Sequence, residues 1–195
     1  MLHLTSDAKE RWRATVIKGN VDISFVTQEA LDATRYAETT SVGHANGLWE
    51  EMDVLHPEYP EGSDIIYQSF GDQCPQWAHD VSKLFTWVDH KQITINKIMP
   101  GRFIPPHKDK MYKMRQYLDD ANVYTENKEL VRITIFLQDH KIGHWLNIDN
   151  HSYDNYSKGD YTYIFPEQLH VVGNLGNEPR YTMQVTGLID YRAKI

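Results

Sequence analysis

The sequence contains a single cysteine, Cys74, so no disulfide bond can form within the chain. Low cysteine content is typical of proteins in reducing compartments, and it predicts a cytoplasmic location. No apolar run approaches the roughly 20 residues that a membrane helix needs, and the first ten residues lack the apolar core of a signal peptide. We therefore expect no membrane partner. Internal repeats and low-complexity segments are also absent from the sequence.

Basic residues are few relative to acidic ones: 20 Lys and Arg against 27 Asp and Glu give a formal net charge of -7. An acidic chain gains no general attraction to phosphate groups, which argues against a nucleic-acid partner, although a local basic cluster runs from Lys108 to Arg115. Apolar residues make up 41% of the 195 positions, as in globular proteins. The length and composition predict a single domain, 1–195, with a substantial core.

The second half of the chain consists of β-rich segments separated by turn signals. Many of these segments alternate apolar and polar residues or are rich in β-branched and aromatic residues. Seven strands are predicted: 93–98, 102–109, 130–138, 144–148, 161–165, 170–174 and 180–188. Strands of this length with short turns predict a small barrel or sandwich of antiparallel sheets, such as a jelly roll.

The first half has a different character. Thr27 can cap a helix that extends to Ala37, and Pro75 can begin a second helix that extends to Asp89, with an apolar stripe on one side. Other expected features are a hairpin (11–17 with 21–26), a loop (38–64) and a short strand (64–70). Residues 1–91 therefore read as a helical and mixed region that supports a β core formed by residues 92–189.

A candidate metal-binding pattern occurs in the second predicted strand, at His107-Lys108-Asp109. With 10 histidines and 27 acidic residues, chance predicts about one His-x-acid pair in this chain. Two occur, and the other, His56-Pro57-Glu58, lies in a proline-rich loop pattern. The pair at 107–109 follows a strand and a turn, as a metal site in a barrel would, so the context favours it.

Alternate residues of a strand project from the same side, so His107 and Asp109 are expected to face one way. Together with a second histidine from elsewhere they would form the facial triad that binds iron(II) and leaves coordination positions open. His170 opens a predicted strand after a turn and is the favoured third ligand; His144 is its rival. His140 and His151 read as loop residues.

The last predicted strand carries Arg180, Thr182, Gln184 and Thr186 on one face. That face is either solvated or directed into the barrel. In the second case the Arg180 guanidinium needs a partner, because an unpaired buried charge is costly. A ligand carboxylate could fill that role, since arginine binds carboxylates with two parallel hydrogen bonds. Thr182 could then donate a further hydrogen bond to the same ligand.

The set His107-Lys-Asp109, distal His170 and Arg180-Tyr-Thr182 resembles the iron(II)- and 2-oxoglutarate-dependent dioxygenases, in particular the prolyl and aspartyl/asparaginyl hydroxylase-like branches. The resemblance covers residues 92–189. It implies an α+β, mainly β fold, in which a double-stranded β-helix (jelly roll) barrel is supported by N-terminal helices. It also implies that His107, Asp109 and His170 bind Fe(II), that Arg180 and Thr182 bind 2-oxoglutarate, and that O2 is the oxidant.

The same resemblance implies an enzyme that hydroxylates a C–H bond of a peptidyl or free amino acid and releases succinate and CO2. Two alternatives stay open: an oxygenase of nucleobases or nucleotides, and a cupin-like protein that binds a metal without turnover. The long connection 110–129 reads as irregular and could be a lid that selects the substrate. Asn96, Thr134 and Tyr163 are expected to add polar groups to the barrel interior.

Overall fold

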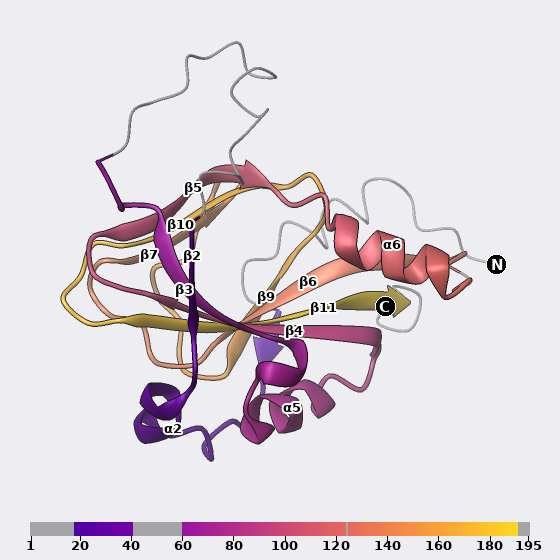
Figure 1. The fold of residues 1–195 in the computed structure, drawn as a ribbon, viewed down its shortest axis with the longest axis horizontal. Coiled ribbons are helices and arrows are strands. Elements are labelled where there is room, and N and C mark those ends of the chain that lie inside the picture. Colours follow the sequence, from indigo (N-terminus) through magenta and orange to yellow (C-terminus); the bar gives the residue numbers. More distant parts are fainter. Residues whose placement is uncertain (1–17, 41–59, 124, 191–195) are drawn as a thin grey trace, which may run out of the picture.

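The structure is a computed structural model that describes residues 18–40, 60–123 and 125–190, and in these residues two antiparallel sheets face each other (Figure 1). The large sheet has the order β1-β9-β6-β11-β4-β3-β2 and the small sheet the order β5-β10-β7-β8. The strands of the large sheet are β1 (Gly19–Asn20), β2 (Ala37–Thr40), β3 (Ile65–Phe70), β4 (Val88–Ile98), β6 (Lys128–Phe136), β9 (Asp160–Ile164) and β11 (Arg180–Asp190). Those of the small sheet are β5 (Arg102–Lys108), β7 (His144–Ile148), β8 (His151–Ser152) and β10 (Leu169–Asn174).

The chain passes back and forth between the two sheets from β4 onward. Strands β4, β6, β9 and β11 are neighbours in the large sheet, and β5, β7, β8 and β10 make up the small one. The exception is the β7–β8 pair, whose two strands both lie in the small sheet. This arrangement of eight antiparallel strands is the topology of a double-stranded β-helix, the jelly roll predicted for this half of the chain. The seven predicted strands are confirmed, with ends that differ by a few residues, and β8 adds a two-residue strand that sequence patterns did not indicate.

The two faces of the large sheet have different partners. On β6, Val131, Ile133 and Ile135 belong to an apolar cluster that includes Leu31 of α2 (Gln28–Ala33) and Val81 of α5 (Gln76–Lys83). Both helices lie on the side of the large sheet away from the small sheet (Figure 1). The N-terminal helices therefore cover the outer face of the barrel, as expected for α5 from its apolar stripe.

A second apolar cluster fills the space between the sheets. It joins residues from strands of both sheets: Ile66, Ile98, Ile104, Phe136, Leu146, Ile148, Tyr153, Tyr156, Ile164 and Val172. A third, smaller cluster forms where α6 (Tyr112–Asp120) packs through Met114 and Leu118 against Leu130 and Leu188. Helix α6 lies at one end of the barrel (Figure 1).

Both predicted helices are shorter than expected. Helix α2 ends at Ala33, because Thr34 adopts an extended conformation, and β2 begins at Ala37. Helix α5 ends at Lys83, and Val88 and Asp89, expected in the helix, begin β4 instead. In each case the last residues of the predicted helix (Ala37; Val88 and Asp89) pair with a neighbouring strand, so tertiary pairing overrides the local helical pattern there.

The expected connections also differ in part. The loop prediction for 38–64 is wrong at residues 38–40, which belong to β2, and residues 110–129 contain α6 and are therefore not irregular. Residues 21–26 form no strand, and residues 11–17 lie outside the described residues. The short strand at 64–70 is confirmed as β3.

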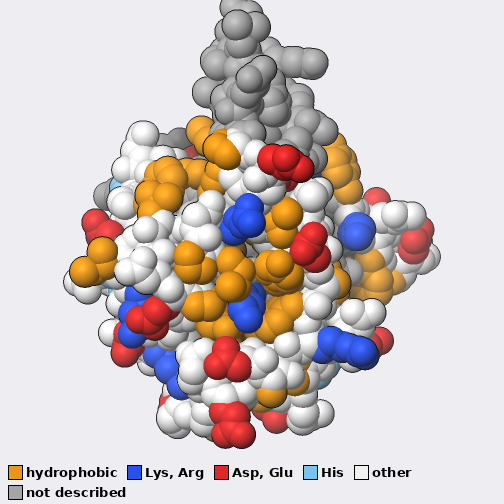
Figure 2. Space-filling model, turned by 60° about the vertical axis from the view of Figure 1, so that its left-hand side comes forward, with side chains coloured by type: hydrophobic (Ala, Val, Ile, Leu, Met, Phe, Trp, Pro, Cys, Tyr) orange, Lys and Arg blue, Asp and Glu red, His pale blue; other side chains and the backbone are white. Residues whose placement is uncertain are grey.

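No helix in the described ranges is long and apolar enough to cross a membrane. On the face shown in Figure 2, hydrophobic side chains gather at the centre, with individual Lys and Arg side chains among them and Asp and Glu side chains around them. Charges of both signs are thus interspersed on this face, a typical arrangement for a protein surface.

Candidate metal centre

The local conformation of β5 directs His107 into the barrel. His107 pairs with His170 and Ile104 with Val172, so β5 advances three residues where β10 advances two. The extra residue forms a β-bulge at Pro105-Pro106. Proline has no backbone N–H to donate, so it is found in bulges and in edge strands such as β5, where one side of the strand is unpaired. As a result both Ile104 and His107 line the same cavity, although a regular strand would turn them to opposite faces.

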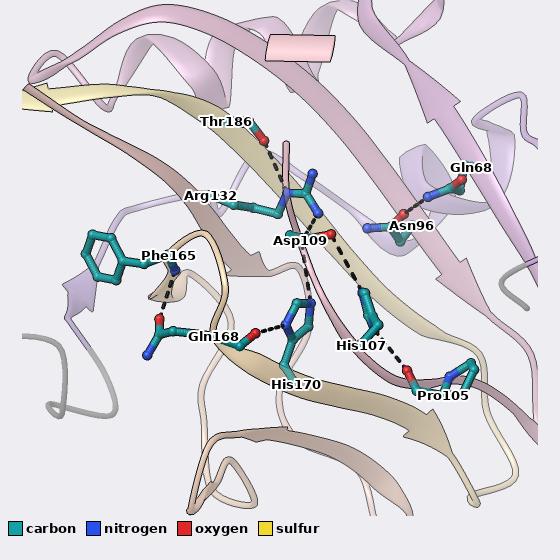
Figure 3. Close-up of polar contacts among 10 residues, drawn as sticks. All are labelled: Gln68, Asn96, Pro105, His107, Asp109, Arg132, Phe165, Gln168, His170 and Thr186. Atoms are coloured by element: carbon teal, nitrogen blue, oxygen red, sulfur yellow. Dashed lines mark hydrogen bonds and ion pairs between the residues drawn. The ribbon is translucent and has the colours of Figure 1, made fainter. Parts of the chain in front are cut away.

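The two histidines are held by backbone carbonyl groups. His107 Nδ1 lies 2.9 Å from the carbonyl oxygen of Pro105, and His170 Nδ1 lies 2.9 Å from that of Gln168 (Figure 3). A hydrogen on Nδ1 that is donated to a carbonyl leaves the Nε2 lone pair free, which is the tautomer that a metal ligand requires. Both imidazoles are buried, and their ring centres lie 4.0 Å apart across the β5–β10 pair.

Asp109 directly follows Lys108, the last residue of β5, and completes the group. Its Oδ1 lies 3.7 Å from His107 Nε2, and its Oδ2 lies 3.4 Å from His170 Nε2 (Figure 3). One ligand atom from each of the three residues lies within 4.8 Å of the others. Two imidazole nitrogens and one carboxylate oxygen that converge in this way are a donor set suited to a divalent transition metal with open coordination positions.

The Asp109 carboxylate is ionised in this setting. Burial opposes ionisation and is the largest single influence on its pKa, but the Arg132 guanidinium and the two histidines together outweigh burial. They hold the pKa of Asp109 well below its usual range. The carboxylate therefore remains available as an anionic ligand across the physiological pH range.

Arg180 lines the same cavity as the two histidines. The cavity has a volume of about 30 Å³ and is lined by both sheets: Asn96, Ile98, Ile104, His107, Thr134, Leu146, Ile164, His170, Val172, Arg180, Thr182 and Gln184. The Arg180 side chain is 2% exposed, and its Nε and Nη2 atoms have no hydrogen-bond partner among the described residues. Burial accordingly lowers the pKa of Arg180, although Tyr156 acts in the opposite direction.

The structure thus brings five predicted site residues to one cavity and its mouth. His107, His170, Arg180 and Thr182 line the cavity, and Asp109 lies beside the two histidines. The face of β11 that carries Arg180, Thr182 and Gln184 is directed into the barrel and not into solvent. The roles of the five site residues as ligands stay predictions.

Other candidates lie elsewhere. His144, the rival third ligand, is buried on β7 and approaches the carbonyl oxygen of Glu178 at 3.2 Å. Asn96 and Thr134 line the cavity as expected, whereas Tyr163 belongs to the outer apolar cluster, because its partner Ile133 faces the helices. His56 lies outside the described residues.

Two further residues, Arg132 and Gln168, support the His–Asp–His group, and the sequence analysis did not single them out. Arg132 on β6 donates to Asp109 Oδ2, and Gln168 provides the carbonyl that orients His170 (Figure 3). Alternation does place Arg132 on the same face as Thr134 and Phe136, so the signal for an inward arginine was present. Its pairing with Asp109 depends on how the two sheets meet.

No protein-family model matches the chain, and no curated protein matches it in sequence. Several solved structures are similar at low identity. A predicted oxalate decarboxylase from Thermotoga maritima is 12% identical over 64% of this chain and 82% of its own, with a TM-score of 0.39. A cupin superfamily protein from Desulfitobacterium hafniense is 11% identical over 67% and 83%, with a TM-score of 0.37. KdgF from Halomonas sp. is 12% identical over 68% and 86%, also with a TM-score of 0.37.

The order of the strands, rather than these similarities, is the basis for assigning the fold. Eight antiparallel strands are divided between two facing sheets, and the two histidines of a His–Asp–His group line the cavity between these sheets. The chain is therefore a double-stranded β-helix protein with a group of side chains that could hold a metal ion.

Proposed function

We propose that this chain is an iron(II)- and 2-oxoglutarate-dependent oxygenase that hydroxylates a C–H bond of a peptidyl or free amino acid. The observation that carries the proposal is the pair of unpartnered donors on Arg180, buried in the same cavity as His107 and His170. A buried guanidinium without an anion is costly, so the cavity is matched to a ligand that carries a carboxylate.

The residues present fit such a ligand and a metal. His107, Asp109 and His170 would hold iron(II), and Arg180, with Thr182 beside it on the inner face of β11, would receive the far carboxylate of 2-oxoglutarate. Bound together, iron(II) and 2-oxoglutarate supply the oxidising chemistry for hydroxylation, with succinate and CO2 as co-products.

The chain's own residues have three tasks in this proposal. The backbone carbonyls of Pro105 and Gln168 keep the two imidazoles in the ligating tautomer. The apolar side chains of both sheets, such as Ile98 of β4 and Val172 of β10, limit the access of water to the cavity. Arg180 and Thr182 would bind and orient the co-substrate from the inner face of β11.

The first test is spectroscopic. Anaerobic protein with iron(II) and 2-oxoglutarate is expected to develop a visible charge-transfer band that neither component produces alone. His107→Ala should abolish the band, because it removes a metal ligand, and Arg180→Met should raise the apparent dissociation constant of 2-oxoglutarate by about tenfold or more. Arg35→Met changes an exposed arginine and serves as the matched control. A band that is absent with the unchanged protein would refute the proposal.

The second test addresses the substrate. Release of succinate should be measured over free amino acids, peptides and nucleotides, with and without iron(II). Stimulation by amino acids or peptides would support the proposed substrate class. Stimulation by nucleotides alone would identify the chain as a nucleobase or nucleotide oxygenase.

A metal-binding protein without turnover, similar to cupins, is a second candidate. One observation favours it: Arg180 has contacts within the chain, since its guanidinium interacts with Tyr156 and lies 5.9 Å from the centre of the Phe136 ring. These contacts compensate part of the buried charge without a ligand. A protein that binds a divalent metal through His107 and His170 but whose spectrum ignores 2-oxoglutarate would fit this candidate.

A further inference from the structure

Arg132 joins the candidate metal centre to the large sheet. Its Nη1 donates to Asp109 Oδ2, and its Nε donates to the Thr186 hydroxyl at 3.2 Å (Figure 3). Arg132 and Thr186 are direct partners in the β6–β11 pair, so the guanidinium is anchored by strand register as well as by its own hydrogen bonds. The Arg132 side chain is 22% exposed and that of Asp109 is 11% exposed. The contact therefore lies near the mouth of the barrel.

This contact distinguishes the two oxygens of Asp109. Oδ2 accepts from Arg132 and also lies 3.4 Å from His170 Nε2, whereas Oδ1 has no contact with Arg132 and faces His107 Nε2 at 3.7 Å. A carboxylate with both oxygens free can ligate a metal through one oxygen or through two. Because the guanidinium engages Oδ2, ligation through Oδ1 alone is favoured. A second carboxylate oxygen would otherwise occupy a position that the co-substrate or oxygen needs.

We propose that Arg132 is a positioning residue that holds the Asp109 carboxylate so that it ligates the metal through one oxygen. The proposal rests on the proposed function, since it requires a metal at His107, Asp109 and His170. Arg132 is not among the residues that line the cavity, and in this proposal it acts through Asp109.

Two effects of removing Arg132 oppose each other, which makes the sign of the result informative. Loss of a cation near a divalent metal removes repulsion and by itself would tighten metal binding. Loss of an orienting contact to a ligand weakens metal binding, typically by about 10- to 100-fold. A positioning role predicts that the second effect dominates.

The experiment is a titration of the full chain with cobalt(II) without oxygen, followed by visible absorption. Arg132→Met is expected to raise the cobalt dissociation constant about 10- to 100-fold and to change the intensity of the cobalt bands, since the freed carboxylate can add its second oxygen. Lys128→Met is the matched control, because it removes a cation from the same strand that pairs instead with Asp89. The control should bind cobalt like the unchanged protein.

The outcomes separate this proposal from the proposed function. Equal or tighter cobalt binding by Arg132→Met, while the unchanged protein binds and His107→Ala does not, would overturn the positioning role alone. No cobalt binding by the unchanged protein would overturn both. If circular dichroism shows that Arg132→Met does not fold, Arg132→Lys takes its place. It keeps the charge but loses the two-pronged donor, so its binding should weaken on the order of threefold or more, and unchanged binding would again overturn the proposal.

Discussion

At the scale of single residues, the candidate centre depends on groups outside the three predicted ligands. The Gln168 side chain accepts a hydrogen bond from the Phe165 amide at 2.8 Å and donates to Asp149 Oδ2 at 2.8 Å, while its carbonyl orients His170. One residue therefore fixes both the turn before β10 and the direction of a ligand. Supporting contacts of this kind commonly affect metal binding nearly as much as the ligands do.

Gln168→Ala tests this support. We expect the free energy of unfolding to fall by about 1 kcal/mol, because two side-chain hydrogen bonds of a half-buried residue are lost, and cobalt(II) binding to weaken by up to about tenfold. Urea denaturation and cobalt titration measure the two effects. Gln76→Ala, which removes an exposed pair with Asp80 on α5, is the control. A lower free energy of unfolding together with an unchanged cobalt affinity would restrict Gln168 to a structural role.

Lys18 provides a prediction of pH dependence away from the centre. Burial lowers its pKa from 10.5 to about 8, and its Nζ lies 5.9 Å from the centre of the Tyr163 ring. Between pH 8 and 10.5 the unfolded chain binds more protons at this site than the folded chain, so Lys18 makes stability rise with pH in this window. Below it, the folded chain must hold the partly buried ammonium in its charged form.

Lys18→Met should therefore stabilise the protein more at pH 7 than at pH 10, because only at pH 7 does the substitution remove a partly buried charge. Urea denaturation of both proteins at the two pH values measures the difference. Comparing the two proteins at each pH cancels the titration of groups that they share, among them the buried tyrosines. If Lys18→Met changed the free energy of unfolding by the same amount at pH 7 and at pH 10, the lowered pKa of Lys18 would be contradicted.

At the scale of elements, α6 determines what covers the end of the barrel. The prediction of an irregular lid at 110–129 is wrong in its conformation, since Met114 and Leu118 dock the helix on Leu130 of β6 and Leu188 of β11. A docked helix can still select a substrate, and that role stays a prediction. Helix α6 begins only a few residues after Asp109. The packing of α6 and the position of Asp109 therefore depend on the same segment of chain.

Met114→Ala should lower the free energy of unfolding by about 2–5 kcal/mol, because the Met114 side chain is 1% exposed and its removal leaves a cavity under α6. Lys113→Ala, at the neighbouring exposed position, should change it by less than about 0.5 kcal/mol. Thermal and urea denaturation measure both. Cobalt binding by Met114→Ala should persist, since the three ligands lie on β5, β10 and the residue after β5; loss of that binding would show that α6 also orders Asp109.

At the scale of the whole molecule, the outer face of the large sheet needs a cover. Buried residues of β4, β6 and β11, such as Ile95, Ile133 and Met183, pack in one cluster with residues of α2 and α5. Without that cover, a large apolar area would meet water, and such areas cause association. The N-terminal region is thus a structural part of the barrel in this chain.

We accordingly expect residues 88–195 not to fold alone. Such a fragment should bind a hydrophobic dye, lack the near-ultraviolet circular dichroism of packed aromatics, and associate in solution. The full chain under the same conditions is the control. Cooperative unfolding of a monomeric fragment would show that the β core is independent of residues before Val88.

The sequence by itself determined most of the strands, because their residues alternate with a period of two that local composition makes visible; Leu130 to Phe136 is the clearest case. It also determined the candidate ligands, since His107, Asp109, His170 and Arg180 are chemically distinct residues in a recognisable order. Helix ends were less predictable, because residues such as Val88 pair with a strand that is distant in sequence.

Only the tertiary structure decided which face of each strand is inside and which groups meet there. The bulge at Pro105-Pro106 turns His107 inward through its register with β10, and the 23 positions between Asp109 and Arg132 are bridged by the packing of two sheets. The burial of Arg180 with unpartnered donors arises in the same way. Register, burial and contact between sheets are set by long-range pairing, which local sequence patterns do not encode.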